Sequence, residues 1–159
     1  MMKLIALCAG LFLANSAVAQ TNIALGGPIV DTTATIEVIA DSLSVDQDTG
    51  MAVFDGNVII GQGDLRITAG RVEVVYGTDT SQIARLVASN GVTFVTATEA
   101  AEAQEADYDI ETGILVLSGE VLLTQGSSAI SAGQMRINVA DGTATMDGRV
   151  RTVLQQGDN

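Results

Sequence analysis

The hydrophobic and polar positions along this chain alternate in the way that is typical of β-strands. From Ile36 onward, short runs of Val, Ile, Leu and Thr alternate with polar residues, and each run ends at Gly, Asp, Asn or Ser. Period-two alternation predicts strands with one buried face, and the small polar residues between them favour turns. The predicted strands lie near residues 35–40, 43–46, 51–55, 57–61, 64–69, 71–76, 83–89, 92–98, 106–110, 114–118, 120–124, 129–132, 135–139, 143–147 and 149–154.

One stretch, Ala97–Ala106, fits two local structures. Its alanines and the three-residue spacing of Glu99, Glu102 and Glu105 favour a helix by intrinsic propensity. Its position just before the second copy of an internal repeat favours a strand instead. We expect a strand with an irregular edge, so that the whole domain is all-β.

The internal repeat is the strongest long-range signal in the chain. Thr49–Val74 reads again, without a gap, at Thr112–Ile137. Shorter echoes occur at Asp141–Val150 (DGTATMDGRV) and at Leu86–Val92 (LVASNGV), where Asn and Gly are in swapped order. Self-similarity of this kind indicates stacked strand–Gly turn–strand units that share one core. Two sheets of such strands, closing on each other, predict a sandwich or a jelly roll.

Alternation also assigns one face of the strands to the interior. This predicted inner set is almost entirely aliphatic, and we place Phe54, Phe94, Leu117 and Leu123 near its middle. An aliphatic set of this kind fits either the ordinary core of a β-sandwich or an apolar groove for acyl chains. The predicted inner residues are Leu43, Val45, Phe54, Val58, Ile60, Leu65, Ile67, Val72, Val74, Leu86, Val92, Phe94, Leu115, Leu117, Val121, Leu123, Ile130, Met135, Ile137 and Met146.

The first nineteen residues have the composition of a secretory signal peptide. A basic start with Lys3 precedes an apolar run that is shorter than the roughly twenty residues needed to span a bilayer, and Ala17-Val18-Ala19 is a small-residue cleavage site. We therefore expect cleavage after Ala19, export to the periplasm and one mature domain. The predicted organisation is a signal peptide at 1–19, a flexible lead-in at 20–34 with little ability to pack, a β-domain at 35–154 and a frayed tail at 155–159.

Charge and residue usage exclude several classes of function. The chain has 7 Lys+Arg against 19 Asp+Glu, a net charge of −12, so nucleic-acid binding is not expected. The chain contains no His, and its only Cys and Lys, Cys8 and Lys3, lie in the predicted signal peptide. The mature chain would therefore lack the usual general base, zinc ligand and thiol nucleophile. We expect no enzymatic activity and no cofactor.

The carboxylates have a simpler interpretation than catalysis or metal binding. Asp46, Asp48 and Asp55 cluster near glycines and superficially resemble the start of a calcium loop. The downstream bidentate Glu of such a loop is missing, and Asp is common in hairpin turns without any ligand. We interpret the cluster as turn residues and expect no metal site.

The order of these motifs resembles the lipopolysaccharide-transport periplasmic bridge proteins of the LptA type, which have an OstA-like domain. The resemblance is carried by ADSLSVD at 40–46, the first repeat copy, ASNGVTF at 88–94, and ADYDIETGILVLSGEVLLTQGSSAISAGQMRINV at 106–139. It extends from about Ala40 to Val150. It implies an open, twisted β-jelly roll without enzymatic activity, whose apolar interior holds the acyl chains of lipopolysaccharide.

The resemblance also implies partners. Members of this family stack end to end through edge strands, and they connect an inner-membrane export complex to an outer-membrane translocon. Ile36 and Val38 at one end, and Val150 and Thr152 at the other, are the candidate partner edges.

Two features depart from the family's usual sequence. Asn90-Gly91 stands where Gly-Asn is usual, so the local bend is expected to differ. The chain is acidic and lacks a Lys-rich tail, so cationic contacts to lipid phosphates are limited to Arg66, Arg71, Arg85, Arg136, Arg149 and Arg151.

Two other functions remain open from the sequence. One is the inner-membrane-anchored partner of the same pathway, which would retain its N-terminal segment as a membrane helix. The other is a structural exported β-sandwich with a closed core, which would bind no lipid.

Overall fold

The computed structural model describes residues 21–25, 33–46, 48–77 and 82–154, and within this part all regular structure is β-strand. The described residues form thirteen antiparallel strands in one folded sheet. In chain order they are β1 (Thr21–Ala24), β2 (Ile36–Ile39), β3 (Ser42–Asp46), β4 (Met51–Gln62), β5 (Leu65–Tyr76), β6 (Ile83–Ser89), β7 (Val92–Val95), β8 (Glu99–Ala103), β9 (Glu105–Asp109), β10 (Ile114–Gln125), β11 (Ser128–Asn138), β12 (Thr143–Asp147) and β13 (Arg151–Val153).

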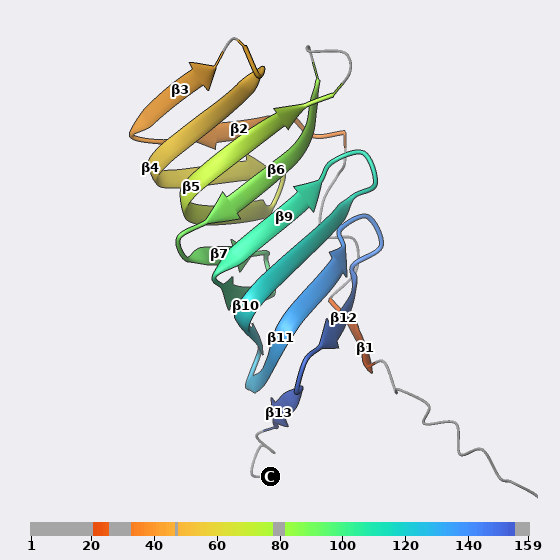
Figure 1. The fold of residues 1–159 in the computed structure, drawn as a ribbon. Coiled ribbons are helices and arrows are strands. Elements are labelled where there is room, and N and C mark those ends of the chain that lie inside the picture. Colours follow the sequence, from red (N-terminus) through yellow and green to blue (C-terminus); the bar gives the residue numbers. More distant parts are fainter. Residues whose placement is uncertain (1–20, 26–32, 47, 78–81, 155–159) are drawn as a thin grey trace, which may run out of the picture.

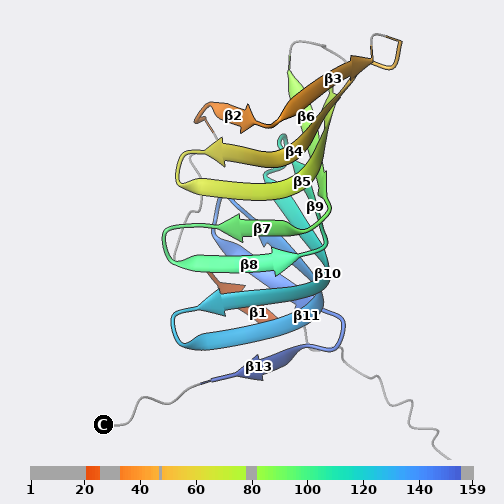
Figure 2. The ribbon, with the colours of Figure 1, turned by 90° about the vertical axis from the view of Figure 1, so that its left-hand side faces the viewer.

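The sheet folds over on itself into two layers, because the four long strands β4, β5, β10 and β11 bend at their middle. The first layer, called layer A, has the order β2-β4-β5-β7-β8-β10-β11-β13. The second, called layer B, has the order β3-β4-β5-β6-β9-β10-β11-β12-β1. Layer B faces the viewer in Figure 1, and Figure 2 shows layer A as a stack from β2 to β13. This arrangement confirms the predicted all-β open jelly roll.

The bends line up in a row, here called the seam, and the glycines of the repeat lie in it. Each turn of the seam has two consecutive residues in the left-handed region, at Gly56-Asn57, Asn90-Gly91, Gly119-Glu120 and Gly148-Arg149. Backbone bonds join neighbouring bends; for example, the Asp41 N–H donates to the Gly56 carbonyl at 2.9 Å. The expectation of a different bend at Asn90-Gly91 is wrong: φ is +65° and +79° there, so the swapped order builds the same corner, because Asn enters this region more readily than other non-Gly residues.

At two of its bends the seam favours glycine for space as well as for dihedral angles. At Gly119, with φ of +80°, an added Cβ would lie 2.8 Å from the Cβ of Gln104. At the equivalent Gly56 it would lie 2.6 Å from Oδ2 of Asp41. At these two bends a larger residue would fit only if the neighbouring side chain shifted.

Strand pairing divides the domain into two structural units of six strands each. β2 and β3 flank β4 in the first unit as β8 and β9 flank β10 in the second. β6 and β7 lie on β5 as β12 and β13 lie on β11. The two units meet at the β7–β8 and β6–β9 pairs. The repeat seen in the sequence therefore extends over the whole domain.

The ambiguous stretch 97–106 is strand, as expected, and its irregular edge is a break between β8 and β9 at Gln104, which lies in the seam. The predicted lead-in needs a correction. Thr21–Ala24 form β1, which pairs with β12, and Leu25 is only 1% exposed. An edge strand left open at β12 offers these residues backbone partners that local sequence does not reveal. The predicted signal peptide and the tail at 155–159 lie outside the described residues.

Candidate functional site

The inner faces of the two layers form one continuous apolar interior, which is the candidate site. Sixteen of the twenty predicted inner residues are buried, with exposed fractions from 0 to 3%. They are Val58, Ile60, Leu65, Ile67, Val72, Val74, Leu86, Val92, Phe94, Leu115, Leu117, Val121, Leu123, Met135, Ile137 and Met146. Phe54 and Ile130 are partly buried and pack against this cluster. Alternation therefore assigned the faces correctly along the strands.

Leu43 and Val45 depart from the expectation of burial. They lie opposite Phe54 and Ala52 on β4, so their side chains belong to the inner face, yet they are 54% and 61% exposed. The reason is their place in the sheet: β3 is the edge strand of layer B and diverges from β2, the edge of layer A, as Figure 2 shows. Phe54, expected near the middle, lies beside this open end. The interior therefore has an apolar mouth at the β2–β3 end.

The buried hydrophobic and polar residues outside the predicted set are seven alanines, Val139 and four further residues that bear on the site. Leu25 and Tyr108 are 1% and 3% exposed, and Gln62 and Glu99 are buried polar residues. Tyr108 is detectable from the repeat, because it stands 63 positions after Val45, the same offset that relates Gly56 to Gly119. No sequence signal marks Leu25, because its burial depends on the pairing of β1 with β12.

The buried polar residues link the two layers on the side away from the seam. The Tyr108 hydroxyl on β9 of layer B donates to Oε1 of Gln62 on β4 of layer A at 3.0 Å. Nε2 of Gln62 donates to the Ala34 carbonyl at 3.3 Å. Gln125, the repeat equivalent of Gln62, donates in the same way to the carbonyl of Ala24 in β1, also at 3.3 Å. These single side-chain hydrogen bonds hold the layers together less strongly than the continuous backbone hydrogen-bond ladders of the seam.

Burial raises the pKa of the Tyr108 phenol above its usual value, which keeps it neutral and able to donate to Gln62. Glu99 lies on the inner face of β8 and receives hydrogen bonds from the hydroxyls of Thr96 and Thr98, both at 2.6 Å, and from Gln125 at 3.2 Å. Burial alone would raise the pKa of Glu99, but these three donors outweigh it and hold that pKa below its usual value. Glu99 is thus a buried carboxylate satisfied within the protein.

The two layers end in short edge strands. Among the described residues, β2 pairs only with β4, and β13 only with β11. Ile36 and Val38 of β2 are half-buried and lie on its inner face, whereas Val150 and Thr152, near and within β13, are exposed. The predicted partner edges are therefore edges of layer A. The sequence did not indicate that β3 and β1 form the corresponding edges of layer B.

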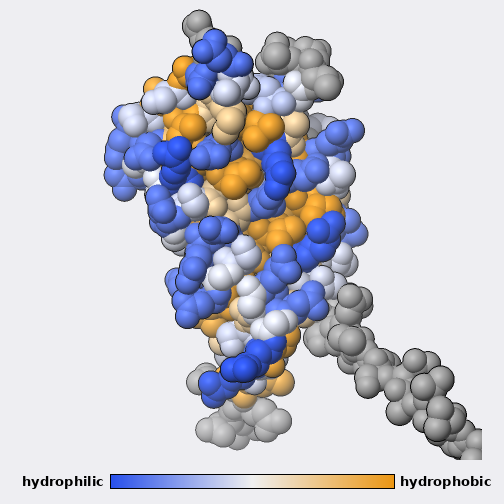
Figure 3. Space-filling view, in the orientation of Figure 1, coloured by the Kyte–Doolittle hydropathy of each residue, from blue (hydrophilic) through white to orange (hydrophobic). Residues whose placement is uncertain are grey.

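Cationic residues lie on the outside of the sheet, away from the apolar interior. Arg71 forms ion pairs with Asp55 at 3.3 Å and with Glu73 at 3.2 Å, and Arg85 pairs with Asp107. Arg85 and Arg136 line a shallow groove of about 590 Å³ on the outer face of layer B. Figure 3 shows this face as largely polar, with apolar side chains reaching the surface between charged ones.

The acidic turn residues act locally. Oδ1 of Asp46 accepts the backbone N–H groups of Asp48 and Thr49, at 2.9 and 3.2 Å, and the equivalent Asp109 accepts that of Thr112. These bonds lower the pKa of both carboxyls. This geometry confirms the turn at Asp46 and Asp48, whereas Asp55 lies in β4, where it forms an ion pair with Arg71. The described part of the chain holds no group of three or more potential metal ligands and no helix with the length and apolarity to cross a membrane.

Comparisons with known proteins show which proteins this chain resembles. A family model described as LptA/(LptD N-terminal domain) LPS transport protein matches residues 37–157. An uncharacterised protein of Rhizobium meliloti (strain 1021) is 28% identical over 154 residues, covering 89% of this chain and 83% of that protein. Among solved structures, LptH of Pseudomonas aeruginosa, described as the LptA homologous periplasmic component of the lipopolysaccharide transport device, matches with a TM-score of 0.70. Its sequence is 17% identical, and the match covers 79% of this chain and 99% of that one.

Proposed function

Because the chain belongs to the LptA/(LptD N-terminal domain) family of LPS transport proteins, we propose that it is a non-enzymatic periplasmic carrier that bridges the inner and outer membranes. In this role it holds the acyl chains of lipopolysaccharide in its apolar interior. The lipid-contacting residues are the inner set defined above, from Leu43 and Val45 at the mouth to Phe94, Leu117 and Met146 deeper inside. The sugar and phosphate groups remain in water outside the layers.

The observation that carries this proposal is the continuous apolar inner face, which begins at the exposed Leu43 and Val45 and runs through Phe94 to Leu117. The one buried carboxylate on it among the described residues, Glu99, is hydrogen-bonded within the protein. Exposed apolar side chains at the end of such a face are the feature expected of a lipid entry point. Burial of an acyl chain contributes roughly 0.8 kcal/mol per CH₂ group.

The side chains of the interior are in contact, so an acyl chain must separate the layers to enter. The seam resists this, because its strands are joined by backbone ladders. On the opposite side, the side-chain hydrogen bonds that link the layers among the described residues are Tyr108–Gln62 and Gln125–Ala24. We infer that the layers part along this side while the seam acts as the hinge.

The partners follow from this role. The inner-membrane export complex delivers lipopolysaccharide at one end, the outer-membrane translocon accepts it at the other, and further copies of the chain stack between them through the edge strands β2 and β13. Export requires removal of residues 1–19 after Ala19, and energy for loading comes from the export complex.

Photo-crosslinking in cells that make lipopolysaccharide tests the proposal. A photoreactive amino acid at Phe94, inside the layers, or at Val45, in the mouth, is expected to give a lipid adduct. The matched control is Val95, which follows Phe94 on β7 but points outward and is 38% exposed; Arg66 is a second outward control. Adducts at the two inner positions and none at the outward ones support a conduit. A folded protein with no adduct at either inner position excludes it.

A structural β-sandwich with a closed core is the second candidate, and the burial of the sixteen inner residues favours it. This candidate predicts no lipid adduct at any position. The membrane-anchored partner of the pathway is distinguished by sequencing the N-terminus of the exported protein: a start at Gln20 supports the soluble bridge, whereas a retained Met1 or Met2 supports the anchored form.

A further inference from the structure

The junction between the two structural units shows how one set of edge strands fits another. At this junction β9 of the second unit lies antiparallel on β6 of the first, with Tyr108 opposite Leu86 and Ala106 opposite Ala88. All four of these side chains are buried. Because β12 is the counterpart of β6, and β3 the counterpart of β9, β3 of a second copy would meet β12 in the same register.

The edge of β12 corresponds to the edge of β6 that β9 covers. The chain's own N-terminal strand, β1, occupies this edge of β12. β1 lies antiparallel on β12 with Ile23 opposite Ala144 and Thr21 opposite Met146. Ala144 occupies the position on β12 that Leu86 has on β6, because Leu86 lies opposite Val74 and Ala144 lies opposite the equivalent Ile137. Ile23 therefore takes the place of Tyr108, in the same register and the same strand direction.

The hydrogen bonds that link the two layers show the same replacement of β9 by β1. Gln62 of the first unit bonds to Tyr108 in β9, whereas its equivalent Gln125 bonds to Ala24 in β1. β1 thus imitates, at the last unit of the chain, the strand that a following unit supplies elsewhere.

At the opposite end of the molecule, β3 lacks the cover that β9 has. Val45 and Leu43 are 61% and 54% exposed, whereas their counterparts Tyr108 and Ala106 are each 3% exposed. We propose that β12 is the docking edge for β3 of a second copy, and that β1 occupies this edge as a competing strand which must be displaced before the second copy docks. The inference rests on the proposed bridge in taking a second copy as the partner.

Strand direction excludes the alternative in which β3 simply adds outside β1. Suppose that the seams of the two copies are aligned. Then β3 and β1 both run from the seam towards the side away from it, because Ser42 and Thr21 lie near the seam and Asp46 and Ala24 lie away from it. β3 would therefore be parallel to β1 in a sheet that is antiparallel throughout, whereas it is antiparallel to β12.

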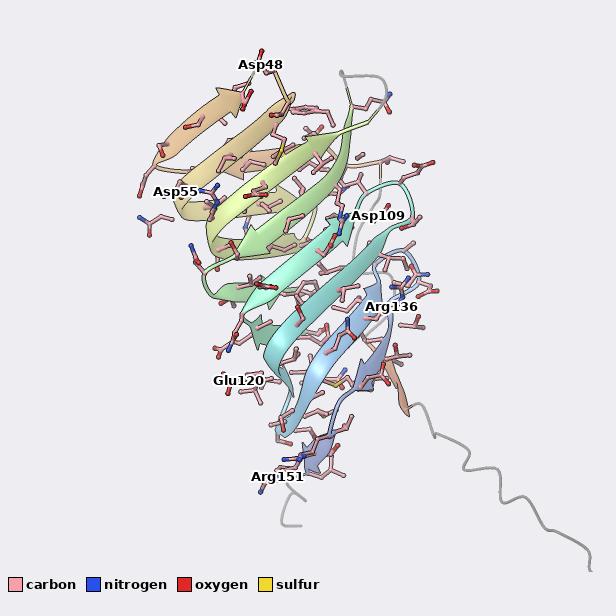
Figure 4. The ribbon with its side chains drawn as sticks, in the orientation of Figure 1. Asp48, Asp55, Asp109, Glu120, Arg136 and Arg151 are labelled. Atoms are coloured by element: carbon pink, nitrogen blue, oxygen red, sulfur yellow. The ribbon has the colours of Figure 1, made fainter. Side chains whose placement is uncertain are left out.

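In layer A, no strand has to be displaced for a second copy to dock. In the register of the β7–β8 pair, β13 of one copy receives β2 of the next, with Thr152 opposite Val38 and Arg151 opposite Ile39. Glu37 then lies diagonally across from Arg151, within reach of an ion pair. Figure 4 shows Arg151 at the β13 end and Asp48 at the β3 end.

Competition weakens docking by a calculable factor. A copy can dock β3 only in the fraction of molecules whose β1 has left β12, and the apparent Kd rises by the inverse of that fraction. If β1 is seated nine-tenths of the time, releasing it strengthens association about tenfold.

Disulfide trapping tests the proposed register directly in the full chain, with Cys8→Ser as background. Ser44→Cys in one population and Thr145→Cys in another occupy the positions that Asp107 and Val87 occupy at the internal junction, directly opposite each other. Mixed and mildly oxidised, they are expected to give a crosslinked dimer. Thr143→Cys is the matched control, because it lies two residues away, opposite Asp46 in the proposed register.

Release and locking of β1 test the competition. Ile23→Pro removes a ladder donor from β1 and is expected to raise the yield of the Ser44–Thr145 crosslink, by up to about tenfold if β1 is seated nine-tenths of the time. Ala24→Cys with Thr143→Cys, which are exposed and face each other across β1 and β12, is expected to lock β1 and abolish association by sedimentation until reductant is added. The reversible lock keeps the test decisive if Ile23→Pro does not fold.

Three results overturn the inference: equal crosslinking at Thr143 and Thr145, no increase with Ile23→Pro in a folded protein, or undiminished association of the locked form. Lipid adducts at Phe94 are a separate measurement. If lipid adducts form but the Ser44–Thr145 crosslink does not, the competition is refuted and the carrier function still stands. If the crosslink forms but the lipid adducts do not, the carrier function is refuted and the competition still stands.

Discussion

The hydrogen bond between Tyr108 and Gln62 is the most informative contact to remove, because it fastens the two layers on the side where we propose that they part. Tyr108→Phe deletes only the hydroxyl. It leaves Oε1 of Gln62, a residue that is 3% exposed, without the donor it has at 3.0 Å. Nε2 of Gln62 keeps its bond to Ala34.

A buried acceptor that loses its donor costs about 1–3 kcal/mol of unfolding free energy, whereas a hydroxyl with no buried partner costs little when removed. Each kcal/mol lowers Tm by about 2–8 °C for domains in this size range. The two changes Tyr108→Phe and Gln62→Leu share one contact, so their combined cost should be smaller than their sum by about 1 kcal/mol.

Urea unfolding of the single variants and the double variant measures this coupling, with Tyr76→Phe as the control. Tyr76 is half-buried, and its hydroxyl has no hydrogen bond among the described residues, so we expect a change within about 0.5 kcal/mol. Equal losses for Tyr108→Phe and Tyr76→Phe, or strictly additive losses in the double variant, would refute the cross-layer bond. Under the carrier proposal, Tyr108→Phe should also increase the lipid adduct at Phe94, because the layers part more easily.

The same tyrosine gives a pH dependence with a defined sign. Burial raises the pKa of Tyr108 in the folded protein above the value of about 10 in the unfolded chain. Above pH 10 the unfolded chain therefore loses this proton while the folded protein retains it, and stability falls as pH rises. Below about pH 9 the tyrosine makes no contribution to the pH dependence of the unfolding free energy. Tyr108→Phe should flatten the alkaline part of the stability curve measured by urea unfolding.

Three further changes test the interior and the seam. Glu99→Gln should lose stability at pH 7 and show a weaker loss of stability from pH 5 to pH 3. The lowered pKa of Glu99 stabilises the fold in full above the unfolded value of about 4.3, and this stabilisation is lost as the pH falls through the lower pKa of the folded protein; urea titrations across this range measure it. Gly119→Ala should cost more than Gly126→Ala by calorimetry, since both have positive φ but only Gly119 meets a neighbour. Phe94→Ala should cost about 3–5 kcal/mol in chemical unfolding and Val95→Ala under about 1 kcal/mol, because only Phe94 is buried.

The sequence predicted the strands and their faces well, because both are local properties of a period-two pattern. Gly56 and Gly119 marked the bends, and alternation on either side of them identified Val58 and Val121 as inner residues, both of which are buried. The helical composition of the stretch around Glu99 was outweighed by pairing on both sides, with β10 and with β7.

The features that the sequence did not reveal depend on where a strand lies in the sheet. Val45 and Tyr108 hold equivalent positions in the repeat, yet one is exposed and the other buried, because only β9 has a neighbour on its far side. Periodicity is the same at an edge and in the middle of a sheet. Leu25 illustrates the converse: a short segment outside the repeat became part of the core by pairing with a free edge.

Under the proposed docking, the edges limit uncontrolled association and favour one way of stacking. Unpaired edges invite uncontrolled association, and short edge strands and inward or flanking charges limit it. β2, β3 and β13 have only three to five residues each, and β12 is covered by β1. A second copy satisfies both layers together only by offering β2 to β13 and β3 to β12 in the register of the internal junction. An unrelated strand gains one short ladder and must still displace β1, so the two conditions together favour the chain's own copies over other strands.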